Sequence, residues 1–411
     1  MIATSVSPTA SQATDASTSR VVSIDIFRGL TMAVMIFVNA VAEVRGLPWW
    51  TNHAHAWEDR MTYVDMVFPF FLFAAGMSMP LAVTQRLKRN PSTIALCLHI
   101  LMRVLGLLVL GFILANAEKA DPTKMMLRGG PWALLGLLCM MLFLNVYPRW
   151  ERFPAYANVL RFIGLAGAVF LLAIFRRTTH TGQTAWLDPS YPEILGLIGY
   201  TYLAVAFLYL LTRRWKWTPA LWFVLLVGLC AASAARLFPF PVRLPLYFWP
   251  FGNGAMACIM MAGVVTSILF LGTGQRPSPR FSIGMAAGFA LLALLAGAAL
   301  TPLGISKIRA TPTWSLYSVG AAILLFIALY WLCDLKRWTA WTFPLRSAGS
   351  NTLLTYLLPD LWYFLLVSAG ITFFNSHWNV GASGVIKSLV FTALMLALSA
   401  MLTRFKVRLQ L

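Results

Sequence analysis

The chain is dominated by apolar stretches that are each long enough to cross a lipid bilayer. Of its 411 residues, 59% are hydrophobic and 11% are charged, and its mean hydropathy is +0.75. A soluble domain carries about a quarter of its residues as charged side chains, whereas a membrane span needs roughly 17–25 apolar residues. Because backbone polar groups inside a bilayer must be satisfied within the segment, such spans are helices. The sequence therefore predicts an all-α, polytopic integral membrane helical bundle.

About twelve spans are expected from the lengths of the apolar stretches. Residues 1–20, rich in Ser, Thr and Ala, are predicted to form a disordered cytoplasmic tail. Residues 21–411 are predicted to form a single transmembrane domain, with spans near 24–44, 62–84, 96–116, 131–148, 158–175, 194–212, 219–236, 252–272, 281–301, 313–333, 350–368 and 384–403.

Basic residues are concentrated in alternate loops, for example 86–89, 213–216 and 336–346. The positive-inside rule places these loops and both termini in the cytoplasm. The formal charge of +19 comes from these short clusters rather than from one basic face, so we predict no nucleic-acid partner. The five cysteines lie in apolar stretches without CxxC spacing, which supports neither a disulfide framework nor a metal site.

The loop between the first two spans gathers titratable groups and is predicted to face away from the cytoplasm. It contains His53 and His55, followed by Glu58 and Asp59, and Asp65 opens the second span. Three interpretations remain open: a metal site, an exposed loop, or a general base, since histidine has its unperturbed pKa near working pH. Asp65 either orients a histidine or caps the helix.

Polar residues also lie within the spans, where they are costly and mark function or packing. Asp25 and Arg28 are three residues apart at the start of the first span and can pair on one helix face. Asn39 lies near the far end of that span. Tyr356 and Asp360 are four residues apart and share a face, which either lines a tunnel or forms an internal packing cluster.

Four stretches resemble motifs of the heparan-α-glucosaminide N-acetyltransferase family of transmembrane acyltransferases and its bacterial relatives, and they occur in the same order. These stretches are SIDIFRGLTMAVMIFVNA (23–40), PWWTNHAHAWEDRMTYVDMVFPFFLFAAGMSM (48–79), TPTWSLYSVG (311–320) and GSNTLLTY (349–356). The first two are specific in combination, and the last two gain weight from their shared order.

The resemblance implies a reaction and a catalytic histidine. The family takes an acetyl group from acetyl-CoA and passes it to the amine of a terminal glucosamine-type sugar. Its essential histidine lies in the loop before Thr-x-x-Asp-x-Val-Phe-Pro. Counting forward from Trp49 selects His53, whereas counting back from Thr62 selects His55. We place His53 first and His55 second, with Asp65 holding the imidazole.

The resemblance also implies a membrane location and a set of ligand contacts. We expect the bacterial cytoplasmic (inner) membrane, with acetyl-CoA, an amino sugar and the lipid bilayer as partners, no metal, and a second copy of the chain as a candidate partner. Arg28 or Arg103 would meet the CoA phosphates. The expected substrate and acetyl-CoA contacts are Asp25, Arg28, Asn39, Trp50, Asn351, Tyr356 and Asp360.

Two other functions fit the sequence. A proton-coupled amino-sugar transporter would use Asp65 and Asp360 as its titrating groups. A polysaccharide O-acetyltransferase would use the same donor but form an ester instead of an amide.

Overall fold

The structure, a computed structural model, describes residues 21–148, 155–237, 245–272, 277–371, 373 and 377–410. The predicted tail (1–20) and the loop residues Arg149, Arg152 and Arg276 lie outside the described residues.

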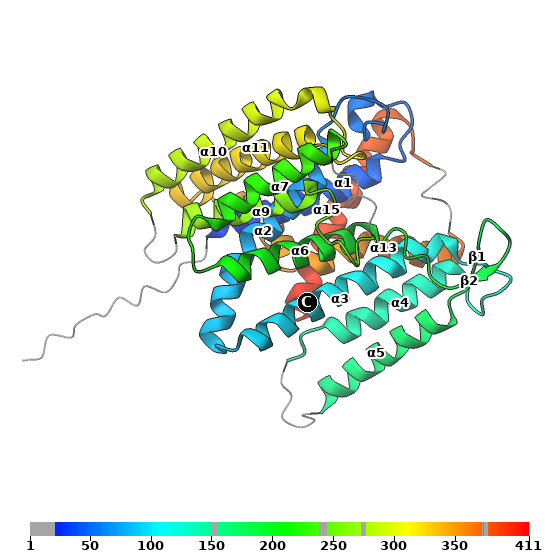
Figure 1. The fold of residues 1–411 in the computed structure, drawn as a ribbon. Coiled ribbons are helices and arrows are strands. Elements are labelled where there is room, and N and C mark those ends of the chain that lie inside the picture. Colours follow the sequence, from blue (N-terminus) through cyan, green and yellow to red (C-terminus); the bar gives the residue numbers. More distant parts are fainter. Residues whose placement is uncertain are drawn as a thin grey trace, which may run out of the picture.

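Each predicted span coincides with a helix in the described part of the chain (Figure 1). The long helices are α1 (Val22–Val41), α2 (Val64–Arg89), α3 (Thr93–Asn116), α4 (Gly129–Leu144), α5 (Tyr156–Ile174), α6 (Glu193–Thr212), α7 (Thr218–Ala234), α9 (Ala255–Leu271), α10 (Pro279–Ala299), α11 (Pro312–Leu329), α13 (Thr352–Ala369) and α15 (Gly381–Arg404). A π-helical segment (Tyr330–Leu335) extends α11, and the short helix α12 (Phe343–Ser350) precedes α13. One small hairpin pairs β1 (Arg177–Thr178) with β2 (Thr184–Ala185).

Among the described residues, nine helices are long and apolar enough to cross a membrane. The helices α4, α7 and α9 are apolar but shorter. The predicted polytopic helical membrane protein is thus confirmed in its general class. The number of crossings and the side on which the termini lie stay predictions.

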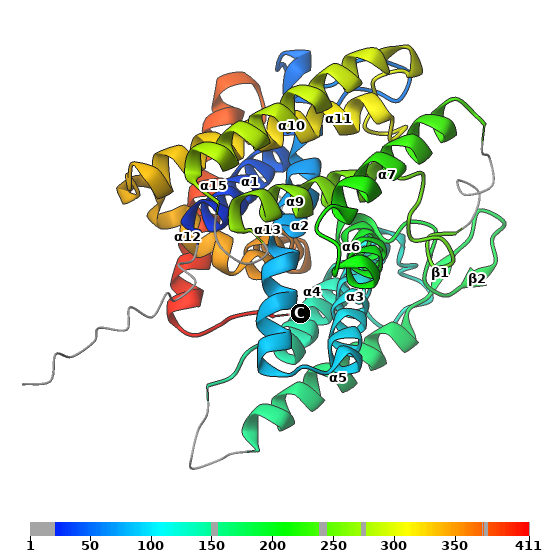
Figure 2. The ribbon, with the colours of Figure 1, turned by 60° about the vertical axis from the view of Figure 1, so that its left-hand side comes forward.

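The centre of the bundle is the contact between α2 and α9. A Cβ atom added at Gly76 would lie 1.9 Å from the backbone oxygen of Met260, and one added at Gly263 would lie 2.1 Å from that of Phe73. Only glycine, which has no Cβ atom, permits the two helix backbones to approach this closely, as expected for helices packed in a membrane. The helices α10 and α11 lie on one flank of this pair, and α3, α4 and α5 lie on the other, with α5 outermost (Figures 1 and 2).

The N-terminus of α1 is capped by a carboxylate that is distant in the sequence. The backbone N–H groups of Val22 and Ser23 donate to Oδ1 and Oδ2 of Asp334, each over 3.0 Å. The first N–H groups of a helix lack internal partners, and a negative charge there is favourable. This contact fixes the end of α1 from which Arg28 projects.

Candidate functional site

Asp65, in the first turn of α2, is buried and collects hydrogen bonds from the preceding loop. Its Oδ1 lies 2.7 Å from Nδ1 of His53, and its Oδ2 accepts the backbone N–H groups of Thr62 (2.9 Å) and Ala54 (3.3 Å). The Asp65 side chain is 1% exposed, whereas that of His53 is 44% exposed. The carboxylate therefore orients the histidine and also ties the loop to the helix.

We infer the tautomer of His53 from its contact with Asp65. A carboxylate accepts hydrogen bonds, so Nδ1 of His53 carries the proton and Nε2 has a lone pair. A histidine oriented in this way by a carboxylate is the arrangement that general bases and nucleophilic histidines use.

His55 is not brought to Asp65. Its ring stacks on Trp57, with centroids 4.5 Å apart and an interplanar angle of 4°, and its backbone N–H donates to Glu58. The carboxylates that a metal site would use contact arginines instead. Glu58 pairs with Arg60 at 2.6 Å, and Asp59 pairs with Arg309. The hydrogen bond from Arg309 holds the pKa of Asp59 below its usual range.

A second loop, residues 304–311, lies against His53. The Nζ atom of Lys307 is 3.2 Å from Nε2 of His53 and 3.4 Å from Nδ1. Burial lowers the pKa of Lys307, and the Asp65 carboxylate opposes that change. Just beyond the loop, the buried Trp314 donates from its indole nitrogen to the backbone oxygen of Asp65 over 3.0 Å. The two loops and the first turn of α2 thus form one connected site.

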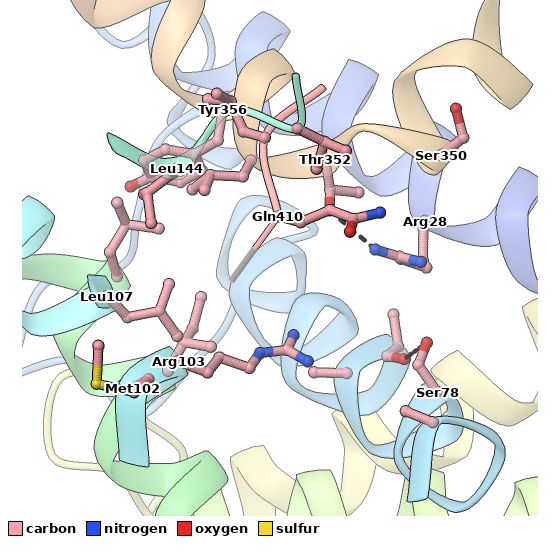
Figure 3. Close-up of a pocket in the computed structure, with 18 of the residues that line it drawn as sticks. Arg28, Ser78, Met102, Arg103, Leu107, Leu144, Ser350, Thr352, Tyr356 and Gln410 are labelled. Carbon is pink, nitrogen blue, oxygen red and sulfur yellow. Dashed lines mark hydrogen bonds between the residues drawn. The ribbon is translucent and has the colours of Figure 1, made fainter. Parts of the chain in front are cut away.

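A cavity of about 770 Å³ lies toward the opposite end of α2 (Figure 3). This volume is within the range of roughly 300–1,000 Å³ that ligand pockets occupy. No acidic side chain is among its lining residues in the described part of the chain. The basic residues that line it are Arg28, Arg86, Arg103, Arg161 and His99.

Two of the cavity arginines contact uncharged side chains. Arg28 donates to the hydroxyl of Thr352 over 2.9 Å. Arg103 stacks over the ring of Tyr202 at 4.4 Å, and its buried Nε atom has no hydrogen-bond partner among the described residues. Figure 3 shows Arg28 and Arg103 extending into the cavity. A half-buried cation with an open hydrogen-bond donor suits an anionic ligand.

Tyr356 of α13 and Phe71 of α2 also line the cavity, and their rings form an edge contact at 6.5 Å. The Tyr356 hydroxyl donates to Glu193 over 2.9 Å. At 1.5 Å rise per residue, the cavity runs roughly 22 Å along α2 from Arg86 to Phe71. Another 9 Å or so of the same helix separates Phe71 from Asp65.

Three of the expected ligand contacts, Arg28, Arg103 and Tyr356, therefore meet in one cavity. Asp360 lies one helical turn beyond Tyr356, outside the residues that line the cavity. Asp25 is half-buried on α1 and is likewise not a lining residue.

The remaining expected contacts lie elsewhere. Asn351 is 2% exposed, and its side chain binds Thr403, Val407 and the backbone N–H of Leu409, so it anchors the C-terminal tail. Asn39 is exposed on α1. Trp50 is 51% exposed and lies 6.2 Å from the ring of Tyr63.

Sequence reasoning missed several of the residues at both sites. Lys307 lies in a short loop without any histidine or carboxylate beside it in the sequence, and His99 lies within an apolar span, four residues before Arg103. Arg86 was visible only as one member of a basic cluster, and Arg161 as a single charge in α5. The only available signal was that a charge inside an apolar helix is costly and needs a reason.

Comparisons with known proteins agree with the motifs. Residues 20–240, more than half of the chain, match the family described as "Domain of unknown function (DUF5009)". The chain is 36% identical over 100 residues to heparan-alpha-glucosaminide N-acetyltransferase of Mus musculus, and 37% identical over 97 residues to that of Homo sapiens. Each match covers 24% of this chain and 14% of the relative. The chain therefore belongs to the DUF5009 family and is a relative of heparan-alpha-glucosaminide N-acetyltransferase, which confirms the resemblance indicated by its motifs.

Proposed function

We propose that the protein is a membrane-bound N-acetyltransferase that moves an acetyl group from acetyl-CoA to the amine of glucosamine or a related amino sugar. The observation that carries this proposal is the contact of 2.7 Å between Nδ1 of the exposed His53 and the buried Asp65. The names of the relatives supply the reaction class.

The cationic cavity supports acetyl-CoA as the donor. The phosphate groups of CoA require several positive charges, and arginine matches phosphate with paired donors. Four arginines line the cavity without an acidic neighbour among its described lining residues. By the positive-inside rule this end of α2 faces the cytoplasm, where acetyl-CoA would enter. The phosphates would remain there while the thioester extends toward Asp65.

His53 would act on the acceptor in one of two ways. As a general base, its Nε2 takes a proton from the amine while the amine nitrogen attacks the thioester carbon and the C–S bond breaks. His53 then returns the proton to the CoA thiolate. As an acetyl carrier, Nε2 itself attacks the acetyl carbon, the C–S bond breaks and CoA leaves as the thiolate. The amine then attacks the acetyl-histidine, the bond from Nε2 to the acetyl carbon breaks, and the amine proton passes by way of Nε2 to the thiolate. Asp65 positions the ring in both cases.

The location and assembly are also proposals. The bundle suits the cytoplasmic membrane of a bacterium, with the His53 loop on the far side from acetyl-CoA, and a homodimer is a candidate assembly. Apolar side chains exposed on the outermost helix α5, such as Phe162 and Phe170, are compatible with a lipid surround.

The test uses purified protein in detergent with acetyl-CoA and glucosamine, and it follows release of free CoA together with the mass of the sugar product. The variants are His53→Ala and, as a matched control in the same loop, His55→Ala. We expect His53→Ala to lose about 10²–10⁴ in rate, as for the loss of a positioned base, and His55→Ala to retain activity.

Three outcomes oppose the proposal. Absence of acetyl transfer by the wild type to any amino sugar refutes the acetyltransferase, and glucosamine uptake into proteoliposomes would then favour the transporter. An ester product would establish the O-acetyltransferase. Loss of activity in His55→Ala alone would exchange the roles of the two histidines.

A further inference from the structure

Lys307 is the residue nearest to His53 whose role the proposed function leaves unexplained. Its ammonium is half-buried and lies within 3.4 Å of both ring nitrogens. Within the described part of the chain, no carboxylate lies within 4.0 Å of its Nζ atom. The nearby Asp65 is already occupied by His53, Thr62 and Ala54. A partly desolvated cation without its own counter-ion is costly, so its position needs a reason.

The distances from Nζ of Lys307 to the two ring nitrogens show that the ammonium does not lie along the lone pair of Nε2. A nitrogen on the axis of the Nε2 lone pair would be much farther from Nδ1 than from Nε2. Because Nζ of Lys307 is almost equally far from both, it lies over the imidazole ring, off that axis. The lone pair of Nε2 therefore remains available to an acceptor amine, with a positive charge 3.2 Å away.

The loop that carries Lys307 is built to hold this position. The side chain of Thr311 accepts the backbone N–H of Ser306 over 3.0 Å, and the N–H of Thr311 donates back to the Ser306 carbonyl. The loop starts at Gly304, whose φ of +86° favours glycine, and a Cβ atom there would lie 2.7 Å from Oδ1 of Asp59. The ion pair of Asp59 with Arg309 joins this loop to the His53 loop.

Resting on the proposed acetyltransferase function, we propose that Lys307 is a catalytic residue that donates a hydrogen bond to the thioester carbonyl oxygen as it becomes negative. When the amine attacks, the carbonyl π electrons move to that oxygen, and the Lys307 ammonium stabilises the charge. When the C–S bond breaks, the electrons return, and the amide oxygen leaves neutral. Lys307 keeps its proton throughout, while His53 carries the proton from amine to thiolate. In this scheme His53 transfers the proton, and Lys307 stabilises the negative charge on the oxygen.

The experiment compares Lys307→Met, which keeps the unbranched side chain up to the ε position and removes the ammonium, with Lys307→Arg, which keeps the charge. Lys119→Met is the matched control, because Lys119 pairs with Asp188 in another loop and does not belong to the site. For each variant we would measure kcat, KM for both substrates, and acetyl-CoA affinity by calorimetry. We expect Lys307→Met to lower kcat by about 10²–10³, the effect of removing one oxyanion donor, with acetyl-CoA affinity unchanged. Lys307→Arg should recover part of the loss.

Each other outcome is decisive. Wild-type kcat in Lys307→Met refutes the inference while leaving the proposed function intact. A parallel loss of acetyl-CoA affinity in Lys307→Met makes the residue a donor-binding group and refutes the oxyanion role. A similar loss in Lys307→Arg and Lys307→Met shows that shape rather than charge matters. Absence of acetyl transfer in the wild type refutes the proposed function itself, and the inference with it.

Discussion

Substitution of Asp65 by asparagine changes one atom at the junction between the His53 loop and α2. In the wild type, Oδ2 of Asp65 accepts two backbone N–H groups, from Thr62 and Ala54, whereas Oδ1 accepts from Nδ1 of His53 and from no other group among the described residues. An asparagine has one oxygen and one NH2 group to place at these positions. Because the NH2 group cannot accept the two backbone donors, its oxygen takes the place of Oδ2 and its NH2 group faces His53.

This orientation forces the imidazole into the opposite tautomer. Nδ1 of His53 then accepts a hydrogen bond from the amide, so Nε2 carries the ring proton and can no longer act as a base. The reverse amide orientation would leave two backbone N–H groups without acceptors, at a cost of about 1–3 kcal/mol each. We therefore expect kcat in Asp65→Asn to fall by about 10²–10⁴, the contribution of a general base, equivalent to about 3–5 kcal/mol in activation free energy.

The assay is CoA release by purified protein under saturating acetyl-CoA and glucosamine. Glu58→Gln is the matched control, because this loop carboxylate contacts Arg60 and the backbone of His55 but neither His53 nor Asp65. The fold should tolerate Asp65→Asn, since both backbone hydrogen bonds are kept. Combining Asp65→Asn with His53→Ala should add no further loss, because residues that act as one unit are not additive. A wild-type rate in Asp65→Asn, or a further loss in the double variant, would refute the tautomer argument.

Two further predictions concern the cavity and the outer loops. Arg103→Met should raise KM for acetyl-CoA by about 10–100-fold and leave KM for the sugar unchanged, since a charge-assisted hydrogen bond contributes about 1.5–3 kcal/mol. The control is Arg280→Met, which removes an exposed charge, and an unchanged KM for acetyl-CoA in Arg103→Met would show that Arg103 does not bind the donor. Hydrogen bonds from Thr123 and Thr178 lower the pKa of Asp121 to about 2. Because its folded pKa is depressed, its stabilising effect is present above the ordinary value of 3.8 and is lost as pH falls toward 2. The difference in melting temperature between wild type and Asp121→Asn should therefore shrink over that window, and a difference independent of pH would contradict this reasoning.

The helices could be predicted from the sequence because their signal is local. A run of apolar residues long enough for the bilayer, bounded by basic loops, is visible without knowledge of any neighbour. The boundaries of α1, α3 and α6 accordingly differ from the predicted ranges by at most a few residues. The pairing of His53 with Asp65 could also be predicted, because the two residues are only twelve positions apart, one in the loop and the other in the first turn of the helix that follows it.

The choice between His53 and His55 could not be made from spacing, because two counts along the same loop gave different answers. The structure separates them by contacts that the linear pattern does not encode. Asp65 binds the N–H groups of Ala54 and Thr62, which brings the segment around His53 over the helix, while His55 turns outward onto Trp57. The same limit applies to Asn351, which lies in a motif but binds the C-terminal tail.

The cavity shows why positive charge in a membrane protein supports more than one interpretation. Arg86 belongs to a cluster that the positive-inside rule interprets as a topology signal, yet it lines the same cavity as Arg103, which lies within the long apolar helix α3. If the positive-inside rule gives the orientation of α2, the same charges would create positive potential on the side from which an anionic donor is proposed to arrive. The carboxylate–histidine pair at the other end of α2 carries no such excess of positive charge, apart from Lys307. If acetyl-CoA binds as proposed, its phosphates would bind toward one end of α2 and the proton transfer would take place at the other end, beside Asp65. The basic residues that are predicted to set the topology would then also determine from which side of the membrane the acetyl group is delivered.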